Sequence, residues 1–138
     1  MMNAREIMHA GVQCIAEDET LATASRMMRD LDVGSLPVCG NDDRLKGIIT
    51  DRDIVVRCVA DGRDPASIRA GDFVGGEIIW VDSDADIDDA LMAMEEHQIR
   101  RLPVLENHRL VGMISEADLA AHLPEDKLAE AVSQIYAR

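Results

Sequence analysis

The chain has 138 residues, of which 47% are hydrophobic and 30% charged, and its formal net charge is −13. This composition is typical of a globular protein, and the acidic balance argues against nucleic acid and anionic membranes as partners, because phosphate-rich surfaces require a basic footprint. No apolar stretch approaches the roughly 20 residues of a transmembrane helix, and the N-terminus lacks the apolar core of a signal peptide. We therefore expect a cytoplasmic protein.

The sequence repeats itself at an offset of 65 or 66 residues. Leu-Pro-Val at 36–38 is followed by Gly-Ile-Ile-Thr-Asp-Arg-Asp at 47–53, and Leu-Pro-Val at 102–104 is followed by Gly-Met-Ile-Ser-Glu-Ala-Asp at 112–118. Two similar units of this kind predict a pseudo-twofold pair, and the cleft between them is the natural place for a ligand.

Each repeat predicts the order strand, helix, strand, strand, helix. In the first repeat these elements are expected at residues 12–16, 21–31, 36–39, 46–49 and 51–59, and in the second at 78–82, 87–97, 102–105, 110–114 and 116–122. Apolar residues three and four positions apart indicate the helices, and a further helix is expected at 127–137. The fold class is α+β, with the first repeat and its leading segment at 1–64, the second repeat at 65–124 and the C-terminal helix at 125–138.

The pairs Thr50/Asp53 and Ser115/Asp118 each stand where a strand ends and a helix begins. One interpretation is a capping box, in which the hydroxyl and the carboxylate satisfy backbone N–H groups of the first turn. A second interpretation, compatible with the first, is a nucleotide clamp. In that clamp the hydroxyl binds phosphate and the carboxylate accepts hydrogen bonds from the two ribose hydroxyls. The presence of both copies in the same register favours the clamp.

The doubled strand–helix–strand–strand–helix pattern, with Leu-Pro-Val and then Gly, two apolar residues, Thr or Ser, and Asp, resembles a pair of CBS domains, the Bateman module. The segment Arg5-Glu6-Ile7-Met8 resembles the stretch that often leads into a first CBS repeat, whereas 70–74 departs from that form. The resemblance implies a stand-alone regulatory protein that senses energy, redox state or stress, with signalling through an unidentified protein target. It implies no required cofactor and no enzymatic activity; a catalytic barrel of about 250 residues would not fit.

The resemblance also implies a ligand and a homodimer. The ligand would be an adenosine derivative such as AMP, ADP or ATP, held in the cleft between the repeats. Thr50 and Ser115 would meet phosphate, and Asp53 and Asp118 would meet ribose. The base would lie near four strand residues: Ile15, Leu36, Val81 and Leu102.

Charge differs between the two predicted sites. Arg52 corresponds to Ala117 in the second repeat, while Arg100 and Arg101 stand where the first repeat has Gly34 and Ser35. Arginine suits phosphate because its planar fork can bind bidentately. A solvated helix end is an equal interpretation for Arg100 and Arg101, and we expect the two sites to differ in affinity.

Cysteine and histidine complete the candidate groups. The family pattern places Cys14 and Cys39 on neighbouring strands, so they are expected to touch and could form a disulfide; two buried thiols are the alternative in a reducing cytoplasm. Cys58 is expected to be buried packing. The four histidines lack metal-ligand spacing, so no metal site is expected. The alternative function is a ligand-free structural or interaction dimer with a redox-responsive Cys14/Cys39 pair.

Overall fold

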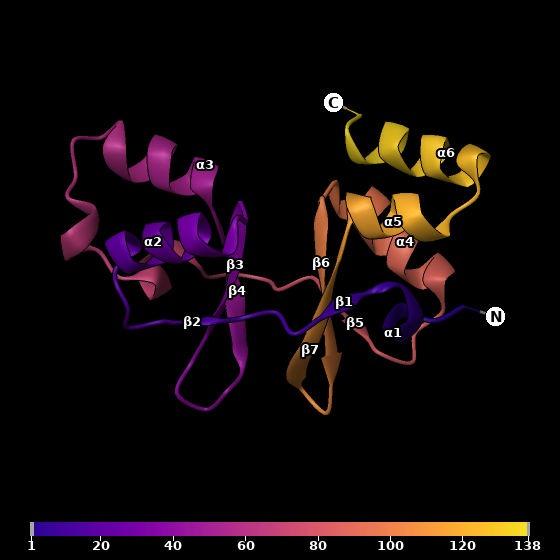
Figure 1. Cartoon of the computed structure of the whole chain (residues 1–138), viewed down its shortest axis with the longest axis horizontal. Helices are drawn as coiled ribbons and strands as arrows, with labels where there is room; N and C mark the ends of the chain where they lie inside the picture. Colours follow the sequence, from indigo (N-terminus) through magenta and orange to yellow (C-terminus); the bar gives the residue numbers. More distant parts are fainter. Residues whose placement is uncertain (1, 138) are drawn as a thin grey trace. The chain divides into compact units, whose positions relative to one another are not determined.

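A computed structural model describes residues 2–137, which form two compact units (Figure 1). One unit is the continuous stretch Gln13–Ile78, and the other combines residues 2–12 with residues 79–137. These units do not follow the linear limits 1–64 and 65–124 expected from the repeats. Residues 2–12 join the unit built from the second repeat, and residues 65–78 join the unit built from the first.

The unit Gln13–Ile78 contains a three-stranded sheet. Its order is β2-β3-β4, formed by β2 (Ile15–Ala16), β3 (Ser35–Cys39) and β4 (Leu45–Thr50), with β2 parallel and β4 antiparallel to β3. The helical elements are α2 (Leu21–Leu31), α3 (Asp51–Ile54), which continues as the π-helix η1 (Val55–Val59), and the 3-10 turns η2 (Pro65–Ser67) and η3 (Ala70–Phe73). Leu21, Ala24 and Met28 of α2 are buried, as the apolar spacing of that helix predicts.

The other unit contains a four-stranded sheet of order β1-β7-β6-β5. Its strands are β1 (His9–Ala10), β5 (Val81–Asp82), β6 (Arg101–Glu106) and β7 (Arg109–Ser115). Its helices are α1 (Ala4–Ile7), α4 (Ile87–His97), α5 (Glu116–His122) and α6 (Glu125–Ile135). The aliphatic core includes residues of both chain pieces, with Ile7, Met94, Leu102, Ile114 and Leu119 almost fully buried.

Most predicted elements are confirmed, and the differences have local causes. The helices 21–31, 87–97 and 116–122 have the predicted bounds. The first strand is shorter than the predicted 12–16, because pairing of β2 with β3 begins at Ile15 opposite Val38. The second-repeat counterpart β5 is shortened in the same way, with pairing that begins at Val81 opposite Val104. The final helix starts earlier than predicted, directly after Pro124, and ends at Ile135.

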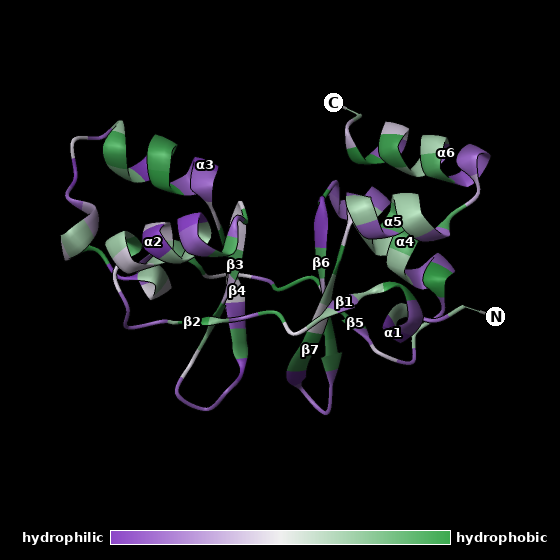
Figure 2. Ribbon diagram, viewed as in Figure 1, coloured by the Kyte–Doolittle hydropathy of each residue, from purple (hydrophilic) through white to green (hydrophobic). Residues whose placement is uncertain are grey.

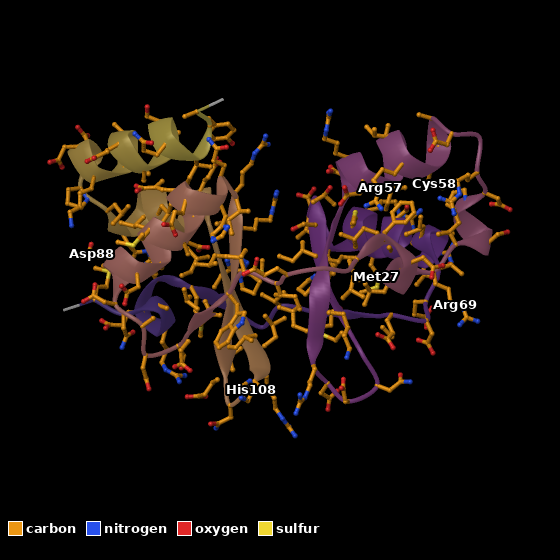
Figure 3. All side chains as sticks on the ribbon, turned by 180° about the vertical axis from the view of Figure 1, so that it is seen from behind. Met27, Arg57, Cys58, Arg69, Asp88 and His108 are labelled. Carbon is orange, nitrogen blue, oxygen red and sulfur yellow. A yellow bond between two sulfur atoms is a disulfide. The ribbon has the colours of Figure 1, made fainter. Side chains whose placement is uncertain are left out.

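The leading segments of the two repeats, residues 4–8 and 70–74, bury equivalent positions despite their different sequences. Ala4 and Ile7 in one segment, and Ala70 and Phe73 in the other, are buried against their respective cores. Residues 70–74 therefore differ from the family form in their side chains, but they still pack against the core of their unit as residues 4–7 do. Arg57 fixes the second segment, since its guanidinium donates to the Phe73 carbonyl at 3.1 Å and lies 4.3 Å from the Phe73 ring centroid. Figure 3 labels Arg57 and the neighbouring buried Cys58, both on the π-helix η1.

Each leading segment crosses the glycine of the repeated strand motif. A methyl group on Gly47 would lie 2.7 Å from Cβ of Val74, and one on Gly112 would lie 2.8 Å from the carbonyl oxygen of His9 and 2.9 Å from Cγ of Met8. Only a residue without a side chain leaves room for these contacts. Glycine in the motif is therefore explained by packing before any ligand is considered.

Substitution of either crossing glycine is expected to destabilise its unit. Gly47→Ala and Gly112→Ala should each lower the free energy of unfolding by about 1–3 kcal/mol, because the added methyl group overpacks a close contact. Gly75→Ala is the matched control, since a methyl group there meets no atom within 4 Å. Urea unfolding of the three variants checks this, and equal stability of all three would contradict the crossing-glycine explanation.

Candidate functional site

The first copy of the hydroxyl–carboxylate motif lies at the junction of β4 and α3. The Thr50 hydroxyl oxygen accepts a hydrogen bond from the backbone N–H of Asp53 at 3.1 Å, and Asp53 Oδ2 accepts one from the backbone N–H of Thr50 at 2.9 Å. This reciprocal pair is a capping box, so the structural interpretation of the motif is confirmed. Among the residues from 2 to 137, no further group donates to the Asp53 carboxylate, which leaves its Oδ1 free to accept.

The second copy lies at the junction of β7 and α5 and is more heavily engaged. Three donors converge on Asp118 Oδ2: the backbone N–H of Ser115 at 2.8 Å, the Ser115 hydroxyl at 2.9 Å and Nδ1 of His9 at 2.7 Å. The Asp118 side chain is 16% exposed and that of His9 is 51% exposed. The Asp118 carboxylate of the second copy therefore accepts more hydrogen bonds than the Asp53 carboxylate of the first copy.

From the sequence, His9 was considered only as a metal ligand and was not placed beside Asp118. It reaches Asp118 because β1 pairs antiparallel with β7, with His9 opposite Met113 and Ala10 opposite Gly112. A sequence signal did exist in the repeat itself. At the offset of 66 residues, His9 corresponds to Gly75, which has no side chain to offer.

The register of each hairpin determines which residue lies opposite Thr50 and which lies opposite Ser115. In the β3–β4 hairpin Ser35 is the register partner of Thr50, and in the β6–β7 hairpin Arg101 is the register partner of Ser115. Directly opposite residues of an antiparallel pair have Cα atoms about 4.5–5.5 Å apart. The structure thus brings Arg101, half-buried, next to the second motif.

The other predicted arginines are placed differently. Arg52 is exposed on the first turn of α3, and Arg100 lies over the ring of Tyr136, with 4.7 Å between its guanidinium carbon and the ring centroid. The neighbouring Glu116 carboxylate raises the pKa of the Tyr136 hydroxyl. Arg100 is thus exposed and at the same time contacts the ring of Tyr136.

The strand residues expected near a base have side chains in the cores. Ile15 and Leu36 belong to one core, Val81 and Leu102 to the other, and each is at most 8% exposed. Their side chains therefore cannot form an open surface for a base. Any contact with a ligand at these positions would have to use backbone N–H and C=O groups.

Cys14 and Cys39 are joined as a disulfide within the unit Gln13–Ile78. Their Cα atoms are 5.9 Å apart, inside the range of roughly 4.4–6.8 Å that a disulfide requires. The cause is the parallel pairing of β2 and β3, where Ala16 is the register partner of Cys39. In the other unit the corresponding Trp80 instead lies edge-on to His108, with ring centroids 6.4 Å apart, and Figure 3 labels His108 in the turn between β6 and β7.

Residues 2–137 show neither a cluster of metal-ligating side chains nor a helix that could cross a membrane. No group of three or more His, Cys, Asp or Glu side chains is placed to hold a metal ion within this part of the chain. In the same residues, no helix combines the length and the apolar character needed to cross a bilayer.

Comparison with known proteins gives a consistent result. The family model for the CBS domain matches residues 4–59 and 70–125. The chain is 51% identical to Hypoxic response protein 1 of Mycobacterium tuberculosis, over 98% of this chain and 94% of that protein. It is 33% identical to the CBS domain-containing protein YhcV of Bacillus subtilis, over 88% and 86% of the respective lengths. A crystal structure of Hypoxic Response Protein I with two coordinated zinc ions has a TM-score of 0.82 and 52% identity, and the match covers 89% of this chain and all of that one.

Formation of the Cys14–Cys39 disulfide is expected to stabilise the oxidised protein. The bond closes a loop with a sequence separation of 25, which is worth on the order of 3 kcal/mol in the loop-entropy model. Addition of dithiothreitol should therefore lower the melting temperature of the parent chain but leave that of Cys14→Ser unchanged. A count of three free thiols in denatured, fully oxidised protein would show that the bond does not form in solution.

Proposed function

Because the chain belongs to the CBS-domain family, we propose that it is a regulatory protein that binds adenine nucleotides of the AMP, ADP or ATP class through the Thr50/Asp53 and Ser115/Asp118 motifs. Its family is regulatory, and no catalytic family is indicated. The response to the ligand would be a change in shape or partner that reports energy or stress. The name of the mycobacterial relative, a hypoxic response protein, supports the stress assignment.

The observation that carries this proposal is the half-buried carboxylate at the start of α3. Asp53 uses Oδ2 for the backbone of Thr50 and retains Oδ1, which suits the two hydroxyl donors of a ribose. A capping role alone uses only one carboxylate oxygen. The Thr50 hydroxyl accepts from Asp53 N–H, so its own proton remains available to a phosphate oxygen.

The base would be read by the backbone of the strands, since the neighbouring side chains lie in the cores. Backbone donors and acceptors that match the hydrogen-bonding edge of adenine leave unpaired groups against guanine, which costs binding free energy. This difference is the physical reason to expect a preference for adenine.

Zinc is not assigned a role in this chain. The related crystal structure contains two coordinated zinc ions, but residues 2–137 of one chain hold no cluster of three or more suitable ligands. The residues present therefore do not fit a zinc site formed by this chain alone, and no step of the proposed function uses a metal.

A second candidate function is an interaction dimer, with or without the redox response of Cys14 and Cys39. The supporting observation is an exposed apolar face on the helix that follows Asp51, where Val55 is 57%, Val56 45% and Val59 55% exposed. Figure 2 shows hydrophobic colouring over this part of the helix. We propose a second copy of this chain as the occupant, because two like valine faces are self-complementary in a twofold pair.

Nucleotide binding is expected to stabilise the protein and to depend on the two carboxylates. AMP or ATP at about 100 times its dissociation constant should add roughly 2.7 kcal/mol and raise the melting temperature by several degrees, with a smaller effect of GMP or GTP. Asp53→Ala and Asp118→Ala should each weaken binding, and by unequal factors, at a cost of about 1 kcal/mol for the lost cap. Thermal shift and isothermal titration calorimetry measure both effects.

The control for this experiment is Asp84→Ala, which removes an exposed carboxylate outside both motifs. No stabilisation by any adenosine compound at millimolar concentration would exclude the proposed function. Equal nucleotide affinity in the parent and in both motif variants, with lowered melting temperatures, would mean that the motifs are caps alone.

The homodimer is expected to be sensitive to charge in the valine face. Val55→Glu and Val59→Glu place carboxylates where two apolar surfaces would meet, so they should shift the sedimentation coefficient from dimer to monomer. Met92→Glu is the control, since it changes an apolar side chain of similar exposure (58%) on α4. A parent chain that sediments as a monomer at high micromolar concentration would exclude this interface.

A further inference from the structure

The two clamp carboxylates differ in one partner that comes from outside the repeated motif. Asp118 Oδ2 is 2.7 Å from His9 Nδ1, and a carboxylate can only accept, so the imidazole donates. Asp53 has no such partner among residues 2–137. Within the motif, the Ser115 hydroxyl also donates to Asp118 Oδ2, whereas the Thr50 hydroxyl accepts from the Asp53 N–H. The His9 contact is the difference that comes from outside the strand–helix junction.

The source of the difference is the residue that follows each leading segment. Met8 lies over Gly112 and Val74 lies over Gly47, so the two segments cross their strands in equivalent registers. The next residue is His9 in one unit and Gly75 in the other. His9 is held along β7 by the pairing of His9 with Met113, whereas residue 75 is outside any strand and carries no side chain.

We propose that His9 is a latch on the second clamp, which competes with the ribose hydroxyls for Asp118. Within residues 2–137, His9 and Ser115 together occupy Asp118 Oδ2 with three hydrogen bonds, so a ribose finds only Oδ1 free there, whereas Asp53 Oδ2 accepts a single bond. Nucleotide then fills the Asp53 site first, and it engages both oxygens of Asp118 only when the His9 contact breaks. This inference rests on the proposed function and extends it by naming a residue outside the motif that contributes to the inequality of the two sites. His9 acts on the ligand through Asp118 and is a positioning residue.

The competing explanation is that His9 and Asp118 simply fasten β1 to the sheet. The His9 side chain is 51% exposed, and even a fully charged pair that is exposed contributes only about 0–1 kcal/mol, which is too little to hold a strand by itself. The same amount, however, changes the affinity of a ligand that must displace the pair by up to about five-fold. An affinity measurement therefore separates the two explanations where a stability measurement would not.

The test uses AMP as the probe and isothermal titration calorimetry of the full chain, in EDTA so that no cation bridges His9 and Asp118. In the Asp53→Ala background, AMP binding reports the Asp118 site alone. Addition of His9→Ala should strengthen this binding by about five-fold, as expected for loss of an exposed pair of about 1 kcal/mol. His108→Ala, which removes an exposed histidine from the same unit, should leave the affinity unchanged.

The converse variant places a latch on the other clamp. Gly75→His has room for a side chain, since a methyl group there meets no atom within 4 Å. In the Asp118→Ala background it should weaken AMP binding at the Asp53 site, by a smaller factor because residue 75 is not held in a strand. An unchanged circular dichroism spectrum verifies the fold of both variants.

The outcomes separate the latch from the function on which it rests. If AMP binding depends on Asp53 but His9→Ala and Gly75→His leave both affinities unchanged, the latch is overturned and the nucleotide site remains. If neither Asp53→Ala nor Asp118→Ala changes AMP binding in the parent chain, the proposed function fails and the latch fails with it.

Discussion

The close crossing of a leading segment over a strand glycine is the constraint on which each unit depends. At Gly47 and at Gly112 a side chain from a distant part of the sequence occupies the space that a β-carbon would need. This contact buries the short helical turns α1 and η3, and it sets the register of whatever follows them. The crossing therefore determines how each leading segment packs, and through this packing it also determines which residues surround the Thr50/Asp53 and Ser115/Asp118 motifs. The same glycine that looks like part of a ligand motif is required by the core.

Local patterns in the sequence were sufficient to predict the elements but not their partners. The helix bounds of α2, α4 and α5 followed from apolar spacing and capping residues, which act within a few positions of the chain. The assignment of residues 2–12 to the unit of the second repeat depends on backbone hydrogen bonds such as Ala4 N–H to Ala85 C=O, which span about 80 positions. No periodicity encodes such pairings. For the same reason the contact between His9 and Asp118 was not predicted, since it forms only once β1 lies beside β7.

The surroundings of each predicted site residue are determined by the backbone element that carries it. Thr50 lies beside Asp53, and Ser115 lies beside Asp118, because each pair spans a single turn. Arg101 joins the second pair because antiparallel register places it opposite Ser115. Ile15, Leu36, Val81 and Leu102 were assigned to the correct strands, but strand alternation turns their side chains into the cores. Two clamps of nearly identical sequence thus have different electrostatic surroundings, and identical motifs need not have identical affinities.

The discontinuous unit has a consequence for the order in which the protein is made. Gln13–Ile78 is continuous, so its sheet and core are complete as soon as that stretch has left the ribosome. Residues 2–12 are synthesised first, yet the strand β7 to which they add is about 100 positions downstream. They must wait, with their apolar side chains unburied, until nearly the whole chain has been translated. Folding during synthesis therefore proceeds from the middle of the chain outward, and the N-terminal residues are among the last to dock.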